Sequence, residues 1–458
     1  MAARSALVRE VETTAESLRD LVATDPEHYP VLLDSVAAGP LARWSMLAAR
    51  PTESLALAAG GTLYRGAEPI GRNGFLDNLE AWWKRDRLKD FELPRDVPFA
   101  GGWFAFLGYE LAAEIEPRLT LPATPDPWGA FALRVPAVVL HDARTNRAFI
   151  AAEPGAERSV ELIARDLAGL RPRAAGARSD SLAISVTEEP PQLFLDRVAH
   201  AKAAILAGDI YQANLSRRWT ASLRTGVDAL ELYERLRQTN PAPFAAFAHR
   251  RGFTILSSSP ERLLQIERGR ISTRPIAGTR PRSANRDRDM AEAAALIAHP
   301  KERAEHIMLI DLERNDLGRV CAAGTVRVDE FMAIETYAHV HHIVSNVSGE
   351  LRADVSPIGA LRAVFPGGTI TGCPKIRCME IVAQEEAEGR GAYTGSLGYI
   401  GHNGDADFNI LIRTLTLEGS DVRLRAGAGI VADSDPQREL EETRAKARGL
   451  LAALGDFR

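Results

Sequence analysis

The chain contains little cysteine: three of its 458 residues, none of them in a C-x-x-C pair. This absence excludes a disulfide framework and a cysteine-based zinc cluster. The sequence also lacks a run of about 18 consecutive apolar residues, the length that a membrane-spanning helix requires. Its first residues include acids where a secretory signal has an apolar core. These absences predict a soluble protein of the cytoplasm with no membrane partner.

Positive charge is not in excess either, since the net charge is −5 and the pI is near 6.1. A nucleic-acid partner is therefore not expected. The chain shows no short repeat and no long low-complexity tract. Residues 169–181, rich in Arg, Ala, Gly and Pro, are the best candidate for an exposed link. We predict an N-terminal region over 1–180 and a second region over 190–455, intertwined in one fold.

Apolar residues that alternate with polar ones predict many strands, joined by hairpin-length connections rather than long crossovers. Over 244–279 the pattern predicts three strands, and over 393–418 a pair. Helical spacing begins near residue 192, with Leu193, Val198, Ala201 and Ile205 on one face. Many antiparallel strands with peripheral helices indicate an α+β architecture.

The last predicted helix carries Glu439, Glu442 and Lys446, whose spacing places all three side chains on one face. Such a face is often only solvated and held together by Glu–Lys pairs. A strand with Gly427 and Gly429 precedes it, however, and strand glycines indicate close approach to the backbone. Carboxylates and a lysine beside that strand suit a carboxylate ligand held through Mg²⁺.

Three further segments carry candidate chemistry. Glu305 stands just before the apolar "IMLI" and is either a structural partner or a metal ligand. Lys375 follows "FPGGTITGCP", where glycines and a helix start offer N–H groups to an anion; the G-K-[ST] ending of an ATP-binding loop is missing. Glu261 and His342 are acid–base candidates. Arg413, a lone charge in an apolar strand pattern, calls for an anionic partner.

Taken together, these segments resemble the chorismate-utilising enzyme family. The resemblance spans about 190–453 and rests on nine motifs in order: "GDIYQANLSRRW", "SSSPERLL", "RPIAGTRPR", "AEHIMLIDLERNDLGRV", "HHIVSNVSG", "FPGGTITGCPKIRCMEI", "AYTGSLGYI", "FNILIRTL" and "GAGIVADSDPQRELEETRAKA". It implies large antiparallel sheets packed face to face, with helices outside. The N-terminal "VLLDSVAAGPLARWSML" and "GGWFAFLGYE" look like the family's two ammonia-using branches.

The resemblance also implies roles for residues at matching positions. Glu261 would be the general acid that protonates the departing C4 hydroxyl of chorismate, while the role of His342 near the reacting carbons and the anion contact of Lys375 stay open. Magnesium would bind the ring carboxylate. Its ligands would be Glu305, Glu439 and Glu442, with Gly278 and Thr279 lining the same pocket. The enolpyruvyl carboxylate would be held by Tyr393, Arg413, Gly427, Gly429 and Lys446.

Two positions bear on the reaction. Members that add water have a lysine where this chain has Gln212, so the resemblance implies ammonia as the nucleophile, delivered by a separate glutamine amidotransferase subunit. Ala277, in "PIAGT", resembles anthranilate synthases, because many aminodeoxychorismate synthases read "PIKGT". "YQANLSRR" and "PAPFAAFAHRRGFTILSSSPERLL" instead resemble aminodeoxychorismate synthases, and we favour that branch. An inactive chorismate-binding regulatory subunit is the alternative of another class.

The N-terminal "LLDS" stretch contains Ser35, at a place where relatives bind tryptophan, and Arg43 follows nearby. These two residues are therefore candidates for a tryptophan site. The alternative interpretation is that Ser35 simply ends a buried strand.

Overall fold

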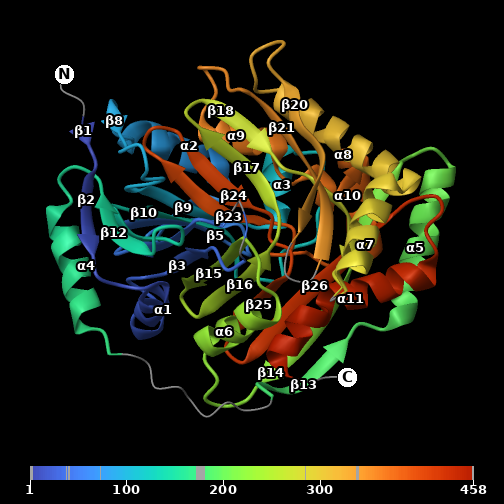
Figure 1. Cartoon of the computed structure of the whole chain (residues 1–458), viewed down its shortest axis with the longest axis horizontal. Coiled ribbons are helices and arrows are strands. Elements are labelled where there is room, and N and C mark those ends of the chain that lie inside the picture. The colour runs from blue at the N-terminus through green and yellow to red at the C-terminus, as the bar shows by residue number, and fades with distance from the viewer. Residues whose placement is uncertain are drawn as a thin grey trace.

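The structure is a computed structural model that describes residues 4–37, 39, 42–72, 74–171, 181–283, 285–336 and 340–455. Most of the predicted link, 172–180, lies outside these ranges. Two twelve-stranded antiparallel sheets dominate the described residues, with helices on their outer faces (Figure 1). The predicted α+β architecture is therefore confirmed. Within the described ranges, no helix is both long and apolar enough to cross a membrane.

The first sheet runs, in spatial order, β13 (Ala183–Glu188), β14 (Gln212–Leu223), β26 (Asp421–Ile430), β25 (Thr414–Glu418), β16 (Phe253–Ser259), β15 (Phe244–Arg250), β3 (Val31–Asp34), β4 (Trp44–Ala49), β11 (Ala137–Asp142), β12 (Arg147–Ala152) and β2 (Leu7–Val11). The short β22 (Gly372–Cys373) also pairs with β14.

The second sheet runs β19 (Ile276–Pro281), β21 (Val340–Glu350), β18 (Arg270–Thr273), β17 (Arg262–Glu267), β24 (Ala406–Asn409), β23 (Ser396–Gly401), β9 (Gly102–Leu107), β10 (Trp128–Val135), β5 (Glu53–Ala58), β6 (Thr62–Arg65) and β7 (Glu68–Arg72), with β20 (Arg327–Thr336) on β21. N-terminal and C-terminal strands pair in both sheets, since β3 is hydrogen-bonded to β15 and β9 to β23. The predicted regional boundary near residue 180 stays a prediction.

Side-chain alternation explains how the layers pack. On β9, Phe104 and Phe106 enter a core shared with Val138 and Leu140 of the other sheet, so this core lies between the sheets. Alternate residues such as Trp103 point to the opposite face, as the period of two in a strand requires. That outer face is covered by α2 (Phe75–Asp86), α8 (Pro300–Gly318), α9 (Pro357–Val364) and α10 (Lys375–Glu386).

A separate apolar core covers the outer face of the first sheet. Its helices are α1 (Ala15–Thr24), α4 (Glu157–Gly169), α6 (Ala229–Thr239) and α11 (Pro436–Leu454). The helices α5 (Pro191–Leu206), α7 (Arg286–Ala298), α8, α10 and α11 gather on one side of the molecule, at the right of Figure 1. The α5 helix buries Val198 and Ala201 and packs Ile205 against the core, as predicted, but it buries Phe194 in place of Leu193, which is 47% exposed.

The strand count was also underestimated. Residues 244–281 form five strands, β15 to β19, rather than three, and 393–418 form three, β23 to β25, rather than two. Two hairpins turn on Arg-Gly pairs, Arg251–Gly252 and Arg268–Gly269, with positive φ at all four residues. Turns of this kind usually carry Asn-Gly or Asp-Gly, so the arginines concealed them in the sequence.

Candidate active site

The chain crosses between the two sheets at two adjacent places. Ser259 to Glu261 join β16 to β17, and residues 410–413 join β24 to β25. The two crossings are hydrogen-bonded to each other: the Ile410 N–H donates to the Glu261 carbonyl (3.0 Å) and the Ser258 N–H to the Arg413 carbonyl (3.0 Å). The fold thus brings together Glu261 and Arg413, which are 152 residues apart. Arg413 lies in a connection with φ of 53°, so its predicted place within a strand was wrong.

The Glu261 carboxyl group is buried, with 5% of the residue exposed, and its Oε1 has no hydrogen-bond partner among the described residues. Burial raises the pKa of Glu261 to about 8, because it disfavours the charged form, and the nearby Glu313 carboxylate adds to the rise. At neutral pH the group therefore holds a proton. A buried, protonated carboxyl group suits a general acid.

This raised pKa predicts how activity depends on pH. If Glu261 must be protonated to act, kcat/KM should be retained up to about pH 8 and then fall roughly tenfold per pH unit. An ordinary glutamic acid, with a pKa near 4.3, would place the fall about four units lower. A pH–rate profile, measured at saturating co-substrate and corrected for the ionisation of that co-substrate, tests this expectation. A limb near pH 4–5 would contradict the role of Glu261.

A glycine-lined strip of β26 faces the polar side chains of β14. Asn214 pairs opposite Gly429, so both occupy one face of the sheet. A Cβ added at Gly427 would lie 2.7 Å from each of the Asn214 Oδ1 and the Tyr393 hydroxyl, and one at Gly429 would lie 2.4 Å from the Gln212 Nε2. Any larger residue would collide with these groups. Glycine is therefore required here by close approach of polar side chains, as the sequence indicated.

Carboxylates approach the same strip from two helices. Glu305, on α8, accepts a hydrogen bond from the Gln212 Nε2 at 3.2 Å. On α11, Lys446 donates to the Gly427 carbonyl (2.9 Å) and forms an ion pair with Glu442 (2.6 Å). Glu439 lies buried in the first turn of α11. The Glu442–Lys446 contact is the i,i+4 pair of the solvated-face interpretation, yet the lysine also reaches the glycine strand.

The predicted magnesium ligands are of the residue type that Mg²⁺ prefers, but they are not gathered around one point in the structure. Within the described part of the chain, no three Asp, Glu, His or Cys side chains are grouped closely enough to hold a metal ion. Mg²⁺, however, commonly takes only one or two carboxylates and completes its shell with waters and substrate oxygens. Glu439 and Glu442 supply such oxygens from α11, which packs against β26, and the Glu305 carboxylate on α8 approaches Gly429 of that strand, so the donor set suits Mg²⁺. Their role as ligands stays a prediction.

His342 and Gly278 meet on the adjoining edge of the second sheet. The Nδ1 of His342 lies 3.4 Å from the Gly278 carbonyl, and burial lowers the pKa of His342 to about 4, which leaves the ring neutral at pH 7. Gly278 has φ of 66°, and a Cβ there would come within 2.9 Å of Glu302. Ala277 is buried, and Thr279 pairs with His342 in the β19–β21 ladder, although the Thr279 side chain lies outside the description.

Tyr393 and Arg413 lie close to the strand that carries Gly427 and Gly429. Burial raises the pKa of Tyr393 to about 12, so its hydroxyl stays a neutral donor near Gly427. Arg413 donates to the Lys446 carbonyl at 2.7 Å. Burial lowers the pKa of Arg413, while the negative charge of Glu442 opposes the change. Two basic groups and a phenol near one glycine strand can hold a carboxylate.

Lys375 is the predicted residue whose surroundings differ most from expectation. Its Nζ forms a buried ion pair with Asp316 of α8 and also donates to the Val364 carbonyl (3.1 Å). The anion that it contacts in the structure is therefore part of the protein. A direct role for Lys375 in catalysis stays a prediction.

The sequence did not predict a buried ion-pair cluster, formed by Glu386, Arg390 and Arg425 and called the hub below. Arg390 donates to the Glu386 carboxylate (3.0 and 2.7 Å), to the Asn214 carbonyl (2.6 Å) and to the Ile370 carbonyl (3.2 Å). Arg425 also pairs with Glu386 at 3.2 Å. The i,i+4 spacing of Glu386 and Arg390 was a signal, but a surface pair has the same spacing. The hub connects β14, α10, β26 and the η2 turn (Gly368–Ile370).

The predicted tryptophan residues lie on another part of the first sheet. The Ser35 hydroxyl donates to the Trp44 carbonyl at 2.8 Å, and Arg43 pairs with Asp142 at 3.0 Å. The Arg43 guanidinium also lies over the Trp44 ring, 4.8 Å from its centroid. Both side chains thus have partners within the protein, and tryptophan binding stays a prediction.

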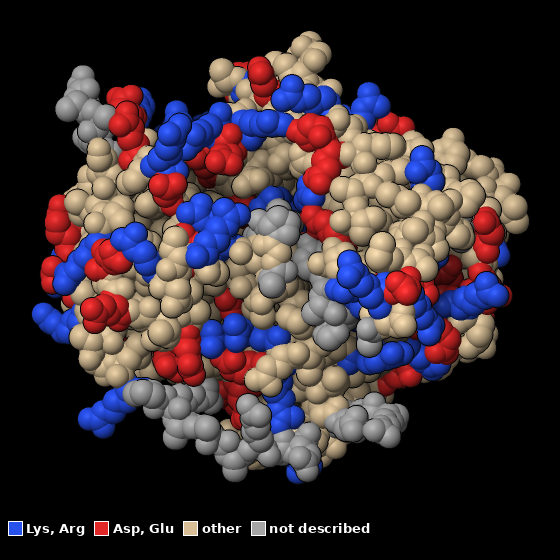
Figure 2. Space-filling view, in the orientation of Figure 1, with Lys and Arg blue, Asp and Glu red and all other residues tan. Residues whose placement is uncertain are grey.

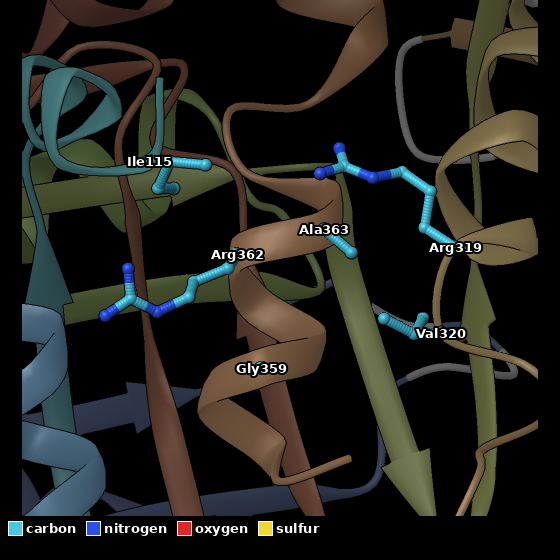
Figure 3. Close-up of a pocket in the computed structure, with 6 residues that line it drawn as sticks. All are labelled: Ile115, Arg319, Val320, Gly359, Arg362 and Ala363. Carbon is cyan, nitrogen blue, oxygen red and sulfur yellow. The ribbon is translucent and has the colours of Figure 1, made fainter. Parts of the chain in front are cut away.

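Surface hollows are distinct from this site. One, of about 240 Å³, lies between the end of α3 (Ala112–Ile115), the end of α8 and α9 (Figure 3). It is lined by Ile115, Arg319, Val320, Gly359, Arg362 and Ala363. None of these was predicted as a site residue, and Arg362 already pairs with Asp77. Acidic and basic side chains are interspersed over the face in Figure 2, in line with the modest net charge.

Comparison with known proteins identifies the family. A match to the family described as chorismate binding enzyme covers residues 42–452. The chain belongs to the chorismate binding enzyme family. The match begins well before residue 190, where the sequence motifs started. The family membership predicted from the motifs is confirmed, and the chain is a chorismate-utilising enzyme of the anthranilate synthase and aminodeoxychorismate synthase type.

Relatives in this family carry both names. The chain is 38% identical over 454 residues to aminodeoxychorismate synthase component 1 of Bacillus subtilis, covering 94% of this chain and 93% of the relative. It is 37% identical over 486 residues to anthranilate synthase component 1 of Synechocystis, covering 98% and 94%. The crystal structure of anthranilate synthase component I from Streptococcus pneumoniae superposes with a TM-score of 0.80 at 31% identity, covering 90% and 93%.

Proposed function

We propose that this protein is component I of an aminodeoxychorismate synthase, which converts chorismate and ammonia into 4-amino-4-deoxychorismate. The observation that best supports amination is the hydrogen bonding of Gln212, the residue at the position where water-adding relatives have a lysine. Its amide nitrogen donates to Glu305, and a carboxamide is no base that could activate water. Ammonia is itself a nucleophile and needs no such activation.

The proposed reaction replaces a C–O bond by a C–N bond. The nitrogen lone pair forms the new bond, and the C4–O bond breaks with its electrons on oxygen. Glu261 supplies the proton that turns the departing hydroxyl into water, and the proton lost from nitrogen restores Glu261. Ala277 has no amine, so a covalent lysine adduct on the ring at this position is excluded. Ammonia must then attack C4 directly, or C2 must be attacked first by ammonia or water.

Binding would separate the two carboxylates of chorismate. Glu305, Glu439 and Glu442 would hold Mg²⁺, which when bound supplies the positive charge for the ring carboxylate. The enolpyruvyl carboxylate would contact the donors along the glycine strand, namely Tyr393, Arg413, Lys446 and the backbone at Gly427 and Gly429. Two separate anchors orient the ring toward Glu261. Gly278 and His342 would line the remaining wall.

Ammonia would come from a separate glutamine amidotransferase subunit. None of the three cysteines lies in a G-x-C-x-G turn, so this chain carries no sign of its own glutaminase nucleophile. Several relatives are named as component 1, which supports a second component.

One observation favours a second function, anthranilate synthase component I. Ala277 is a buried alanine in β19, and the "PIAGT" loop resembles that branch. Ammonia would then form its bond at C2 while the C4 hydroxyl leaves as water, and loss of the enolpyruvyl group as pyruvate would give anthranilate.

A product assay distinguishes these functions. Purified chain is incubated with chorismate, MgCl₂ and ammonium chloride, followed by the lyase specific for 4-amino-4-deoxychorismate. We expect 4-aminobenzoate, formed only when the lyase is added. Fluorescent anthranilate that forms without the lyase would replace the proposal by the second function. Absence of any turnover would instead support the inactive chorismate-binding subunit.

A further inference from the structure

Two buried side-chain amide oxygens lie in one part of the site and have no hydrogen-bond partner among the residues that the structure describes. They are the Gln212 Oε1 and the Asn214 Oδ1. A buried acceptor left unpaired costs free energy, because it has lost its hydrogen bonds to water. Because these atoms lie beside the residues predicted to bind substrate, a ligand that donates hydrogen bonds is the natural partner for them.

The orientations of the two amides are fixed by groups that can only accept. The Gln212 Nε2 donates to the Glu305 carboxylate (3.2 Å), and the Asn214 Nδ2 donates to the Thr369 carbonyl (3.4 Å). Reversing either amide would place two oxygens against each other. The Gln212 Oε1 and the Asn214 Oδ1 must therefore face elsewhere as acceptors. The residues are two apart on β14, so both side chains lie on the face that carries Gly427 and Gly429.

Chorismate alone does not match this pair of acceptors. It offers two carboxylates and an ether oxygen, which are acceptors, and a single hydroxyl donor. Ammonia carries three N–H donors, and the ammonium ion carries four. Thr369, whose carbonyl accepts from Asn214, also neighbours the Glu261 carboxyl. A donor bound on β14 is therefore close to the proposed general acid.

We propose that Gln212 and Asn214 form the binding site for the attacking ammonia and hold it through their side-chain carbonyl oxygens. This inference rests on the proposed amination. It gives Asn214 a function that the sequence motifs did not suggest. It also makes Gln212 a binding residue for ammonia, and not only a residue that cannot activate water.

Steady-state kinetics of Asn214→Ala with ammonium chloride, without any amidotransferase, tests the site. Removal of one acceptor should raise the KM for ammonium about tenfold, the effect of one lost hydrogen bond. The KM for chorismate should stay within about twofold. Thr220→Ala, on the same strand, is the matched control and should change neither constant.

Two results would overturn the inference: an unchanged KM for ammonium in Asn214→Ala, or a rise of both KM values together. Should Asn214→Ala fail to fold by circular dichroism, Gln212→Leu carries the same test with the same outcomes. The proposed function fails separately, because it requires the parent protein itself to aminate chorismate with ammonium.

Discussion

Replacing Glu261 with glutamine is expected to lower kcat about 10²–10⁴-fold, the usual contribution of a positioned general acid. Glutamine has nearly the same shape but carries no proton that it can transfer. The carboxyl is buried, has no partner at Oε1 among the residues that the structure describes, and has a pKa raised to about 8 by burial, so its proton is available at neutral pH. The KM for chorismate should change less than about threefold, since the group acts on the leaving hydroxyl. Steady-state kinetics with ammonium chloride measure both constants.

The control for this variant is Glu267→Gln, an exposed position at the end of β17, which should leave kcat unchanged. Loss of folding would not explain the effect. Because the folded-state pKa of Glu261 lies above the unfolded value near 4.3, the native state holds an extra proton between these values, and its stability falls as pH rises through that window. The glutamine variant should thus be at least as stable as the parent at pH 8. A variant that retains most of its kcat would contradict the assignment.

Replacing Glu386 with alanine is expected to reduce the free energy of unfolding by about 3–5 kcal/mol, because it leaves the buried Arg390 guanidinium without a counter-ion and Arg425 with only its 3.5 Å pair to Glu388. Glu386 is 4% exposed and accepts from Arg390, Arg425 and the Ser216 hydroxyl and backbone N–H. Arg390 in turn holds the Asn214 carbonyl, so catalytic activity should fall with stability. Urea denaturation followed by circular dichroism measures the change.

Acid titration checks the same group. Burial alone would raise the pKa of Glu386, but Arg390 and Arg425 hold it at about 2. A carboxyl whose folded pKa is depressed stabilises the protein above its unfolded pKa and loses this effect as pH falls toward 2. The alanine variant should therefore lose less stability than the parent between pH 4 and pH 2. Glu161→Ala, which removes the exposed pair with Arg9, is the control, with an expected change below about 1 kcal/mol. If Glu386→Ala and Glu161→Ala lowered the free energy of unfolding equally, the stabilising role of Glu386 would be refuted.

Local patterns were enough to locate much of the candidate site. The spacing of Glu439, Glu442 and Lys446 placed them on one face of α11, and Gly427 and Gly429 do lie where polar side chains approach the backbone. Local sequence patterns could not predict the partner of a side chain when that partner is distant in the sequence. The Lys375 side chain binds Asp316, 59 residues away in sequence, and helix-start chemistry alone could not distinguish that carboxylate from a substrate anion.

The sequence by itself determined the family, the α+β class and the residue types available for chemistry, because motifs, periodicity and composition are properties of neighbouring residues. Only the tertiary structure decided which carboxyl group is protonated, which amide oxygens lack donors and which arginines share Glu386. These properties depend on burial and on contacts between segments far apart in the chain. The two crossings between the sheets show this most directly, since they bring residues of distant segments together around Glu261, and its burial there raises its pKa to about 8.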